Sequence, residues 1–114
     1  MQLPEITNET MKAGLSTTKA YCVLVLKKTE KFVSPAVDAI VWEHGRRNFA
    51  LRAAGLMPMV MPVPNGPSIA GFCVFDVPED EVRRLMDEDP GVLAGIFSYE
   101  IYSARSFPGD RLPG

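Results

Sequence analysis

Residues 57–75, MPMVMPVPNGPSIAGFCVF, contain two apolar segments of different pattern on either side of a turn. The first segment, residues 57–63, alternates, and its two prolines have the same parity, so that their missing N–H groups face one edge. Since proline is excluded from central ladder positions, this segment is predicted to be an edge strand. Asn65 and Gly66 predict a tight turn. Residues 68–75, which are apolar without alternation, predict a strand covered on both faces.

The rest of the chain supplies a strand and a helix before this pair, and a helix and a strand after it. Residues 21–26 are again continuously apolar, whereas residues 97–104 alternate as a partly exposed strand does. The first helix is predicted to begin with Ser34 as N-cap and Pro35 as its first residue, and to stop at Gly55. The predicted elements are strand 21–26, helix 35–54, strand 57–63, strand 68–75, helix 78–88 and strand 97–104.

This βαββαβ order is the ferredoxin-like pattern, in which the first and third strands are central and the second and fourth lie at the edges. The two continuously apolar segments take the central positions, and the prolines take an edge. We therefore expect an α+β fold with an antiparallel sheet and two helices on one face. The central strands are apolar on both faces, so the other face also needs cover. A second copy, packed sheet against sheet, is the simplest source of that cover and predicts a homodimer.

Length and composition limit the classes of function. The 114 residues are expected to hold one domain, residues 20–106, between a flexible arm, 1–19, and a turn-rich tail, 107–114. A net charge of −2 argues against a nucleic-acid partner, and no apolar run approaches the roughly 20 residues of a membrane span. The start of the chain lacks the apolar core of a secretory signal, so a cytoplasmic location is expected.

Two cysteines, Cys22 and Cys73, lie far apart in the sequence, each inside an apolar run. Their spacing suits neither a metal site nor a redox pair. We expect two buried free thiols, no metal and no cofactor.

His44 is the only histidine, and it falls on the apolar stripe of the first predicted helix. The stripe comprises Val37, Ile40, Val41 and Leu51. Asn48 lies on the same stripe, one turn after the histidine. Two interpretations stay open: a core histidine with one hydrogen bond to backbone, or a general acid or base, since imidazole titrates near neutrality. Two polar side chains in one apolar stripe favour a lined pocket.

Asp89 precedes Pro90 at the start of a short turn that ends near Gly95. An aspartate before a proline is typical of a helix N-cap, and the alternative role is an ionised partner for His44. The two roles are compatible because a carboxylate has two oxygens. The second helix is expected to pack beside the first, so both side chains can converge at one end of the layer between helices and sheet.

Other polar and aromatic residues are candidates for ligand contact or for surface packing. The substrate-binding candidates are Asn48, Arg46, Ser68 and Tyr21. Arg47 is expected to form an exposed pair with Glu43, four residues earlier. Trp42 and Phe49 share another face of the helix and are expected to pack under the arm or at a subunit contact.

Two segments carry a resemblance to a known family. Residues 43–57, EHGRRNFALRAAGLM, place a histidine eleven residues before a helix-ending glycine. Residues 87–110, DEDPGVLAGIFSYEIYSARSFPGD, place Asp-Pro, then Ala-Gly, then a strand. Both segments resemble the YCII-related family of the dimeric α+β barrel superfamily, and the resemblance covers roughly residues 20–110.

The resemblance implies a ferredoxin-like α+β barrel that dimerises through its sheets, with His44 and Asp89 as an active-site dyad. Relatives include lactone isomerases and dehydrochlorinases, in which a proton moves next to a carbonyl. The expected function is a small-molecule enzyme of lyase or isomerase type. In it His44 transfers the proton, Asp89 orients the imidazole, and Asn48 or Arg46 contacts substrate oxygens. The alternatives are a non-catalytic small-ligand-binding or regulatory dimer, and an accessory subunit of an enzyme.

Overall fold

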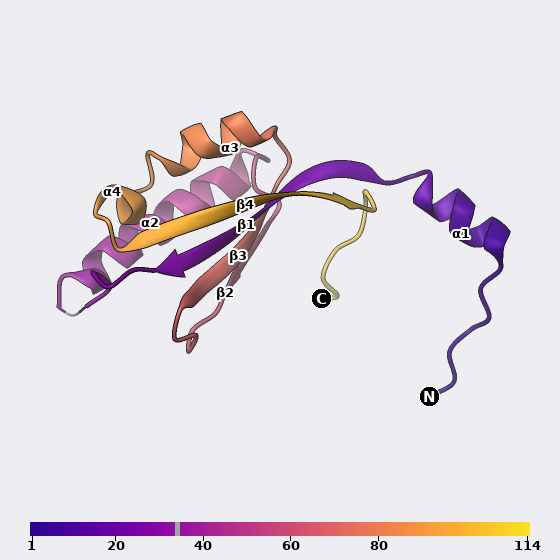
Figure 1. Ribbon diagram of the computed structural model, residues 1–114, viewed down its shortest axis with the longest axis horizontal. Helices are drawn as coiled ribbons and strands as arrows, with labels where there is room; N and C mark the ends of the chain where they lie inside the picture. Colours follow the sequence, from indigo (N-terminus) through magenta and orange to yellow (C-terminus); the bar gives the residue numbers. More distant parts are fainter. Residues whose placement is uncertain (34) are drawn as a thin grey trace.

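The computed structural model describes residues 1–33 and 35–114 (Figure 1). The elements are α1 (Asn8–Leu15), β1 (Lys19–Lys28), α2 (Val37–Ala53), β2 (Met59–Pro62), β3 (Ile69–Phe75), α3 (Glu79–Met86), α4 (Pro90–Leu93) and β4 (Phe97–Ser106). The strands form one antiparallel sheet in the order β2-β3-β1-β4. The continuously apolar strands are therefore central and the proline-containing strand lies at an edge. The predicted ferredoxin-like α+β fold class is confirmed.

The boundaries of the first long helix differ in part from the prediction. α2 begins at Val37, after Ala36, and no side chain caps it. The predicted cap, Ser34, lies outside the described residues. The end of the helix agrees with the prediction, because Gly55 has a φ of 77°. The amide of Leu56 then bonds to the carbonyl of Leu51, which closes the turn typical of a glycine-terminated helix.

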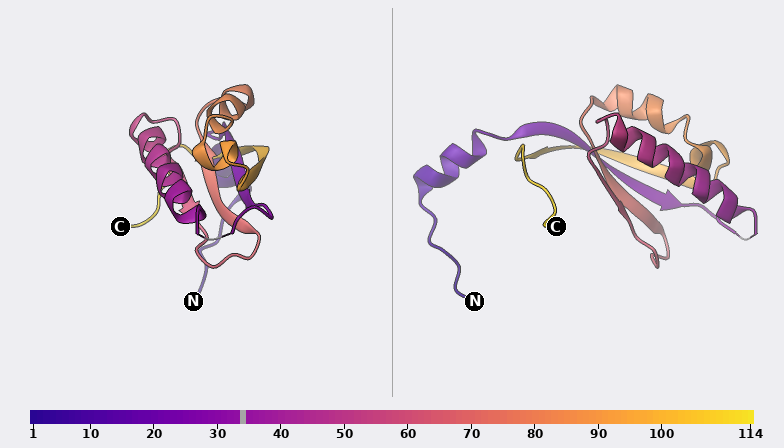
Figure 2. Two further views of the ribbon diagram at one scale, coloured as in Figure 1. Left: turned by 90° about the vertical axis from the view of Figure 1, so that its left-hand side faces the viewer. Right: turned by 180° about the vertical axis from the view of Figure 1, so that it is seen from behind.

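α2 and α3 lie on the same side of the sheet (Figure 2). Alternate residues of β1 and β3 point toward them and are buried: Cys22, Leu24, Leu26, Cys73 and Phe75. The helices add Val37, Leu51, Val82 and Met86 to this core. His44 and Asp89 are the buried polar residues in this part of the structure, so the predicted pair lies inside the main core rather than at its rim.

The opposite face of the sheet is covered only in part by the chain itself. Val25 of β1 is half-buried there, and its neighbour across the ladder, Phe72 of β3, is 37% exposed. Met61 of β2 lies opposite Phe72 and is 43% exposed. An apolar surface thus continues across three strands, as expected from the double-sided apolar character of the central strands.

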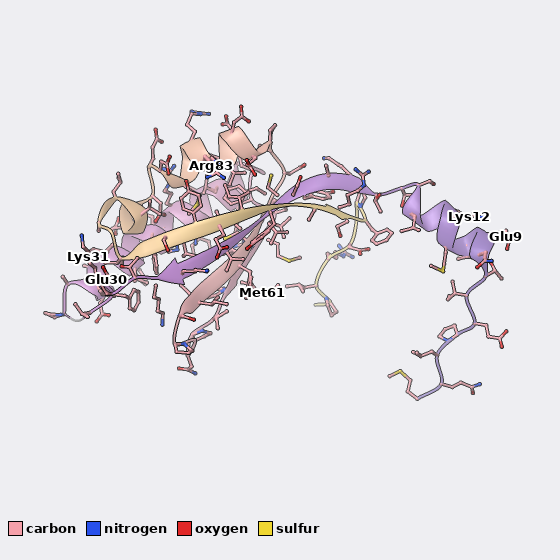
Figure 3. The ribbon with its side chains drawn as sticks, viewed as in Figure 1. Glu9, Lys12, Glu30, Lys31, Met61 and Arg83 are labelled. Carbon is pink, nitrogen blue, oxygen red and sulfur yellow. The ribbon has the colours of Figure 1, made fainter. Side chains whose placement is uncertain are left out.

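Residues 1–18 extend away from the sheet, and they contain a helix that the sequence analysis did not anticipate. α1 is capped by Thr7, whose side chain accepts a hydrogen bond from the amide of Thr10, and none of its eight residues is buried. Its labelled side chains, Glu9 and Lys12, stand clear of the rest of the molecule (Figure 3). The radius of gyration is 16.8 Å, against roughly 13 Å for a compact chain of this length. Within the described residues, the helices are too short or too polar to cross a membrane.

Candidate functional site

His44 and Asp89 form a buried pair between the helices and the sheet. Nδ1 of His44 lies 2.8 Å from Oδ1 and 2.9 Å from Oδ2 of Asp89. The histidine side chain is 11% exposed and the aspartate side chain 2%. The two residues are 45 positions apart in the chain, so the pair depends on α4 packing beside α2. The predicted convergence of the two residues is therefore present.

Asp89 is also the N-cap of α4. Its Oδ2 accepts hydrogen bonds from the amides of Gly91, at 2.9 Å, and Val92, at 3.3 Å. Pro90 is the first residue of the helix, where its missing N–H leaves no backbone donor unsatisfied. The cap and the histidine contact occur together, as the two oxygens of a carboxylate allow. Both interactions fix the carboxylate, so Asp89 has little freedom to turn toward another partner.

The neighbours of the pair determine which ring nitrogen carries the proton. An ionised carboxylate only accepts hydrogen bonds, so Nδ1 of His44 donates to Asp89. Nε2 is then the unprotonated nitrogen of a neutral ring, and the side-chain nitrogen of Asn48 lies 3.2 Å from it. With this tautomer the Asn48 amide donates to Nε2. The three side chains form a chain of hydrogen bonds whose basic end is Nε2.

A cavity of about 280 Å³, here called the inner cavity, adjoins this basic end. Its wall is mainly apolar and includes Leu26, Val41, Val60 and Phe97. The described lining side chains that carry nitrogen are His44, Asn48 and Lys28. A mainly apolar cavity with a few convergent polar groups is the usual form of a small-molecule site.

Phe97, the first residue of β4, holds the imidazole from one side. The two ring centroids are 4.9 Å apart and the ring planes are tilted by 56°. The same phenyl ring packs against Gly91, where an added Cβ would collide with Phe97 and lie 3.1 Å from Oδ2 of Asp89. Glycine at this position is therefore required by the close approach of α4 to β4.

Cys73 of β3 lies in the wall of the inner cavity and is 6% exposed. Burial, with a smaller contribution from the charge of Asp89, raises the pKa of its thiol to about 12. The thiol is thus protonated near neutral pH and is not a nucleophile there. Both cysteines are unpaired and buried, as predicted.

The other candidates from the sequence lie elsewhere. Arg46 is exposed and bonds through Nε to Glu43 at 3.1 Å. Ser68 is exposed, and its backbone carbonyl accepts a hydrogen bond from the backbone amide of Lys28. Tyr21 lies at the opposite end of β1, with Nζ of Lys19 at 5.3 Å from its ring centroid. Of the four substrate-binding candidates, the structure brings only Asn48 to the His44–Asp89 pair.

The pairing predicted for Arg47 is wrong. Its guanidinium turns toward α3 and donates to the carbonyl of Leu85 at 2.8 Å, with Glu88 at 3.6 Å. Glu43 pairs instead with Arg46, three residues away. Arg47 therefore ties α2 to α3, a contact that spacing along one helix does not reveal.

A larger hollow of about 520 Å³, here called the outer groove, adjoins the inner cavity along α2, and Phe32, Val41 and Gly45 line both. Trp42 and Phe49 line it and are 71% and 68% exposed. Its charged lining residues, Asp38 and Arg46, are both exposed. The expectation that the arm covers these aromatic residues is not met within one chain, because the arm extends away from α2 (Figure 1).

Lys28 and Phe97 were not anticipated as site residues. Lys28 could have been found from strand parity, because it continues the series Cys22, Leu24, Leu26 on the face that looks toward the helices. No pattern in the sequence places the Phe97 ring against His44, since that contact depends on where β4 meets α4.

The strand order, with both long helices on one side of the sheet, is that of a ferredoxin-like α+β fold. Among solved structures, the chain is similar to 5-chloro-2-hydroxyhydroquinone dehydrochlorinase of Burkholderia phenoliruptrix AC1100, determined in complex with 2,5-dihydroxybenzoquinone. The TM-score is 0.53 at 14% identity, over 72% of this chain and 90% of that one. At this identity the likeness shows the fold alone. No family model and no curated protein matches the chain.

Proposed function

We propose that this protein is a small-molecule enzyme of lyase or isomerase type in which His44 moves a proton next to a carbonyl. The observation that carries the proposal is the orientation of the imidazole. Nδ1 is held by a buried carboxylate, and Nε2 is the unprotonated end beside the inner cavity. The similar fold of a dehydrochlorinase supports the same reaction class.

In the proposed reaction Nε2 of His44 takes a proton from a substrate carbon beside a carbonyl. Asp89 stabilises the imidazolium that forms and keeps the ring in place, as a carboxylate does in other histidine-based catalysts. In an isomerase the proton returns to a different atom. In a lyase the electron pair of the broken C–H bond expels a leaving group from the adjacent carbon.

Asn48 has to change its contact during this cycle. Its side-chain nitrogen lies 3.2 Å from Nε2 and donates to Nε2 when that nitrogen is unprotonated, whereas a protonated Nε2 needs an acceptor. Rotation of the amide would present Oδ1 instead of Nδ2, because an asparagine side chain carries both kinds of group. Asn48 would therefore stabilise either the neutral or the protonated imidazole of His44. It could also turn away, which would leave Nε2 free to contact the substrate.

Deuterium exchange tests the proposal without requiring the natural substrate. The protein is incubated in D₂O with a panel of hydroxylated quinones and hydroquinones, including 5-chloro-2-hydroxyhydroquinone. Loss of C–H signals is followed by proton NMR, and released chloride is measured. We expect exchange with at least one compound, at a rate that falls by about 10²- to 10⁴-fold in His44→Gln. Phe49→Ala, in the outer groove, should exchange like the unchanged protein.

Two results would count against catalysis. Exchange at equal rates in His44→Gln and the unchanged protein would exclude His44 as the base. Saturable binding of panel compounds without exchange of any of them would favour the non-catalytic small-ligand-binding dimer instead.

We also propose that the protein is a homodimer joined through the open faces of the sheets. The support is the apolar surface formed by Val25, Phe72 and Met61 across three strands, since large exposed apolar patches usually mark interfaces. Light scattering should give twice the mass of the chain, and a monomer mass would contradict the proposal. The two free buried thiols suit a reducing compartment, and we propose the cytoplasm.

A further inference from the structure

Lys28 ends β1 and brings an ammonium group to the inner cavity. Nζ donates to the carbonyl of Gly66 at 2.8 Å and lies 4.8 Å from the ring centroid of Phe32. The preceding residue, Lys27, points to the other face of the sheet and forms an ion pair with Glu100. Adjacent lysines thus have different surroundings, and only Lys28 lines the cavity.

The charge of Lys28 is not balanced by the cavity wall. Among the described residues, the lysines that form ion pairs are Lys19 and Lys27, and no carboxylate is within ion-pair distance of Lys28. The buried carboxylate of the site, Asp89, is engaged by His44 and by the cap of α4. An ammonium has three N–H donors, and the protein accepts one of them at Gly66. Two donors remain for another partner.

We propose that the inner cavity selects small ring-sized compounds with an anionic oxygen, a carboxylate or a phenolate, and that Lys28 is the residue that binds this oxygen. The proposal names the substrate class for the proposed function and rests on it for the identity of the site. The apolar wall around Phe97 accommodates the ring. The anionic oxygen lies at Lys28, and a C–H group of the ring can then face Nε2 of His44.

Two physical effects support this assignment. A charge pair is stronger in a mainly apolar cavity than in water, because the effective dielectric constant is lower. The bond from Nζ to Gly66 and the contact with Phe32 also hold the ammonium in place before a ligand arrives, which reduces the entropic cost of binding. A lysine that only fastened the 63–68 turn would use the same bond but would not distinguish anions from neutral compounds.

The test compares ligands that differ in charge but little in shape. Calorimetry or NMR titration measures the dissociation constants of 2,5-dihydroxybenzoate against 2,5-dihydroxybenzamide, and of 4-nitrophenolate against 4-nitroanisole. The first pair reports on carboxylates and the second on phenolates. We expect the anion of at least one pair to bind roughly tenfold more tightly than its neutral partner, as a charge-assisted hydrogen bond allows.

Variants assign the preference to Lys28. Lys28→Met should abolish it and Lys28→Arg should retain it. Lys27→Met, the matched control on the other face, should leave it unchanged. If Lys28→Met does not fold, the ratio of the dissociation constants of the neutral compound and the anion, measured in the unchanged protein and in Lys28→Arg, still tests the preference for anions. Equal binding of anion and neutral partner, no saturable binding of any probe, or a preference that survives in Lys28→Met would overturn the proposal.

The same titrations separate this proposal from that of catalysis. His44→Gln should lose deuterium exchange but keep the preference for anions, because Lys28 is intact. If exchange is absent from the unchanged protein while the anion preference is present, the catalytic proposal fails and the Lys28 site stands.

Discussion

Two adjoining hollows along α2 differ in the polar groups that they hold, although Phe32, Val41 and Gly45 line both. The outer groove is the larger, about 520 Å³ against about 280 Å³ for the inner cavity, and exposes two large aromatic side chains, Trp42 and Phe49. The inner cavity is smaller, but it holds a buried histidine whose two ring nitrogens both have fixed partners. Chemistry requires groups held at defined positions in a water-poor environment, and the volume of a hollow does not supply them.

The largest expected effect is the difference in reactivity of the Cys73 thiol between the native protein, where it lies in the wall of the inner cavity, and the unfolded protein. Burial raises the pKa of Cys73 from 9.0 to about 12, so at mildly alkaline pH its thiolate fraction is on the order of a thousandfold below that of an ordinary cysteine. Iodoacetamide should therefore modify Cys73 slower by that order in the native protein than in urea, as measured by mass spectrometry of peptides. Equal rates in both conditions would show that the cavity is wet and open.

The raised pKa of Cys73 also has a consequence for stability. The unfolded thiol ionises at its ordinary pKa of 9.0, while the buried thiol does not ionise until about 12. The contribution of this residue to the free energy of unfolding is thus intact below pH 9 and falls as the pH rises further. Cys73→Ser, whose hydroxyl does not ionise there, should show a weaker decline in a series of denaturant titrations.

Removing the carboxylate of the pair should have the next largest effect. Asp89→Ala removes a charge-assisted hydrogen bond to His44 and the cap of α4, and we expect a loss of about 3 kcal/mol in the free energy of unfolding. Asp89→Asn should lose less, because asparagine also caps helices. Thr7→Ala, at the exposed cap of α1, should change stability by less than about 0.5 kcal/mol. An Asp89→Ala protein as stable as its parent would mean that the pair does not form.

Replacing two glycines by alanine compares a tightly packed position, Gly91, with an open one, Gly45. An alanine at Gly91 would collide with Phe97, and Gly91→Ala should cost about 1–3 kcal/mol through overpacking. Gly45 lies in the middle of α2, and a Cβ there would meet no described atom within 4 Å beyond the adjoining backbone of its own helix. Gly45→Ala should therefore stabilise the protein by up to about 1 kcal/mol through helix propensity. Thermal melts measure both, and a reversed order would contradict the described contact between α4 and β4.

The smallest effect is expected for the N-terminal arm. None of the residues of α1 is buried, and an isolated helix of eight residues is marginal in water. Deletion of residues 1–18 should leave the melting temperature within about 2 °C of the full chain. A larger fall would show that the arm packs on a surface, with the outer groove around Trp42 and Phe49 as the first place to look.

The sequence predicted the features of this molecule that follow from local pattern. Same-parity prolines mark the edge strand, continuous apolar runs mark the central ones, and the Asp89–Pro90 pair marks a cap. The position of His44 on the apolar stripe of its helix also led to the pair with Asp89. The strands and the cap follow from a period or from the chemistry of neighbouring residues, whereas the pairing of His44 with Asp89 came from the expected packing of the two helices and from the family resemblance.

Features that depend on contacts between elements were missed or predicted wrongly. Spacing along α2 pairs Arg47 with Glu43, but its guanidinium donates instead to the backbone carbonyl of Leu85 on α3. Phe97 meets His44 only because β4 starts beneath α4. α1 went unnoticed because eight polar and apolar residues give too few turns for a period to stand out. Lys28 was overlooked although its parity placed it on the correct face.

The tautomer of His44 decides whether its imidazole can accept a proton from a compound in the inner cavity. The chain has one histidine, so long-range nitrogen–proton NMR correlations of its ring are assigned without ambiguity. At alkaline pH, where an ordinary imidazole is neutral, we expect a protonated Nδ1 and an unprotonated Nε2 in the native protein. In Asp89→Ala this preference should weaken or reverse. A native protein whose His44 carries its proton on Nε2 would exclude His44 as the base, because the nitrogen beside the inner cavity would then have no lone pair to accept a proton.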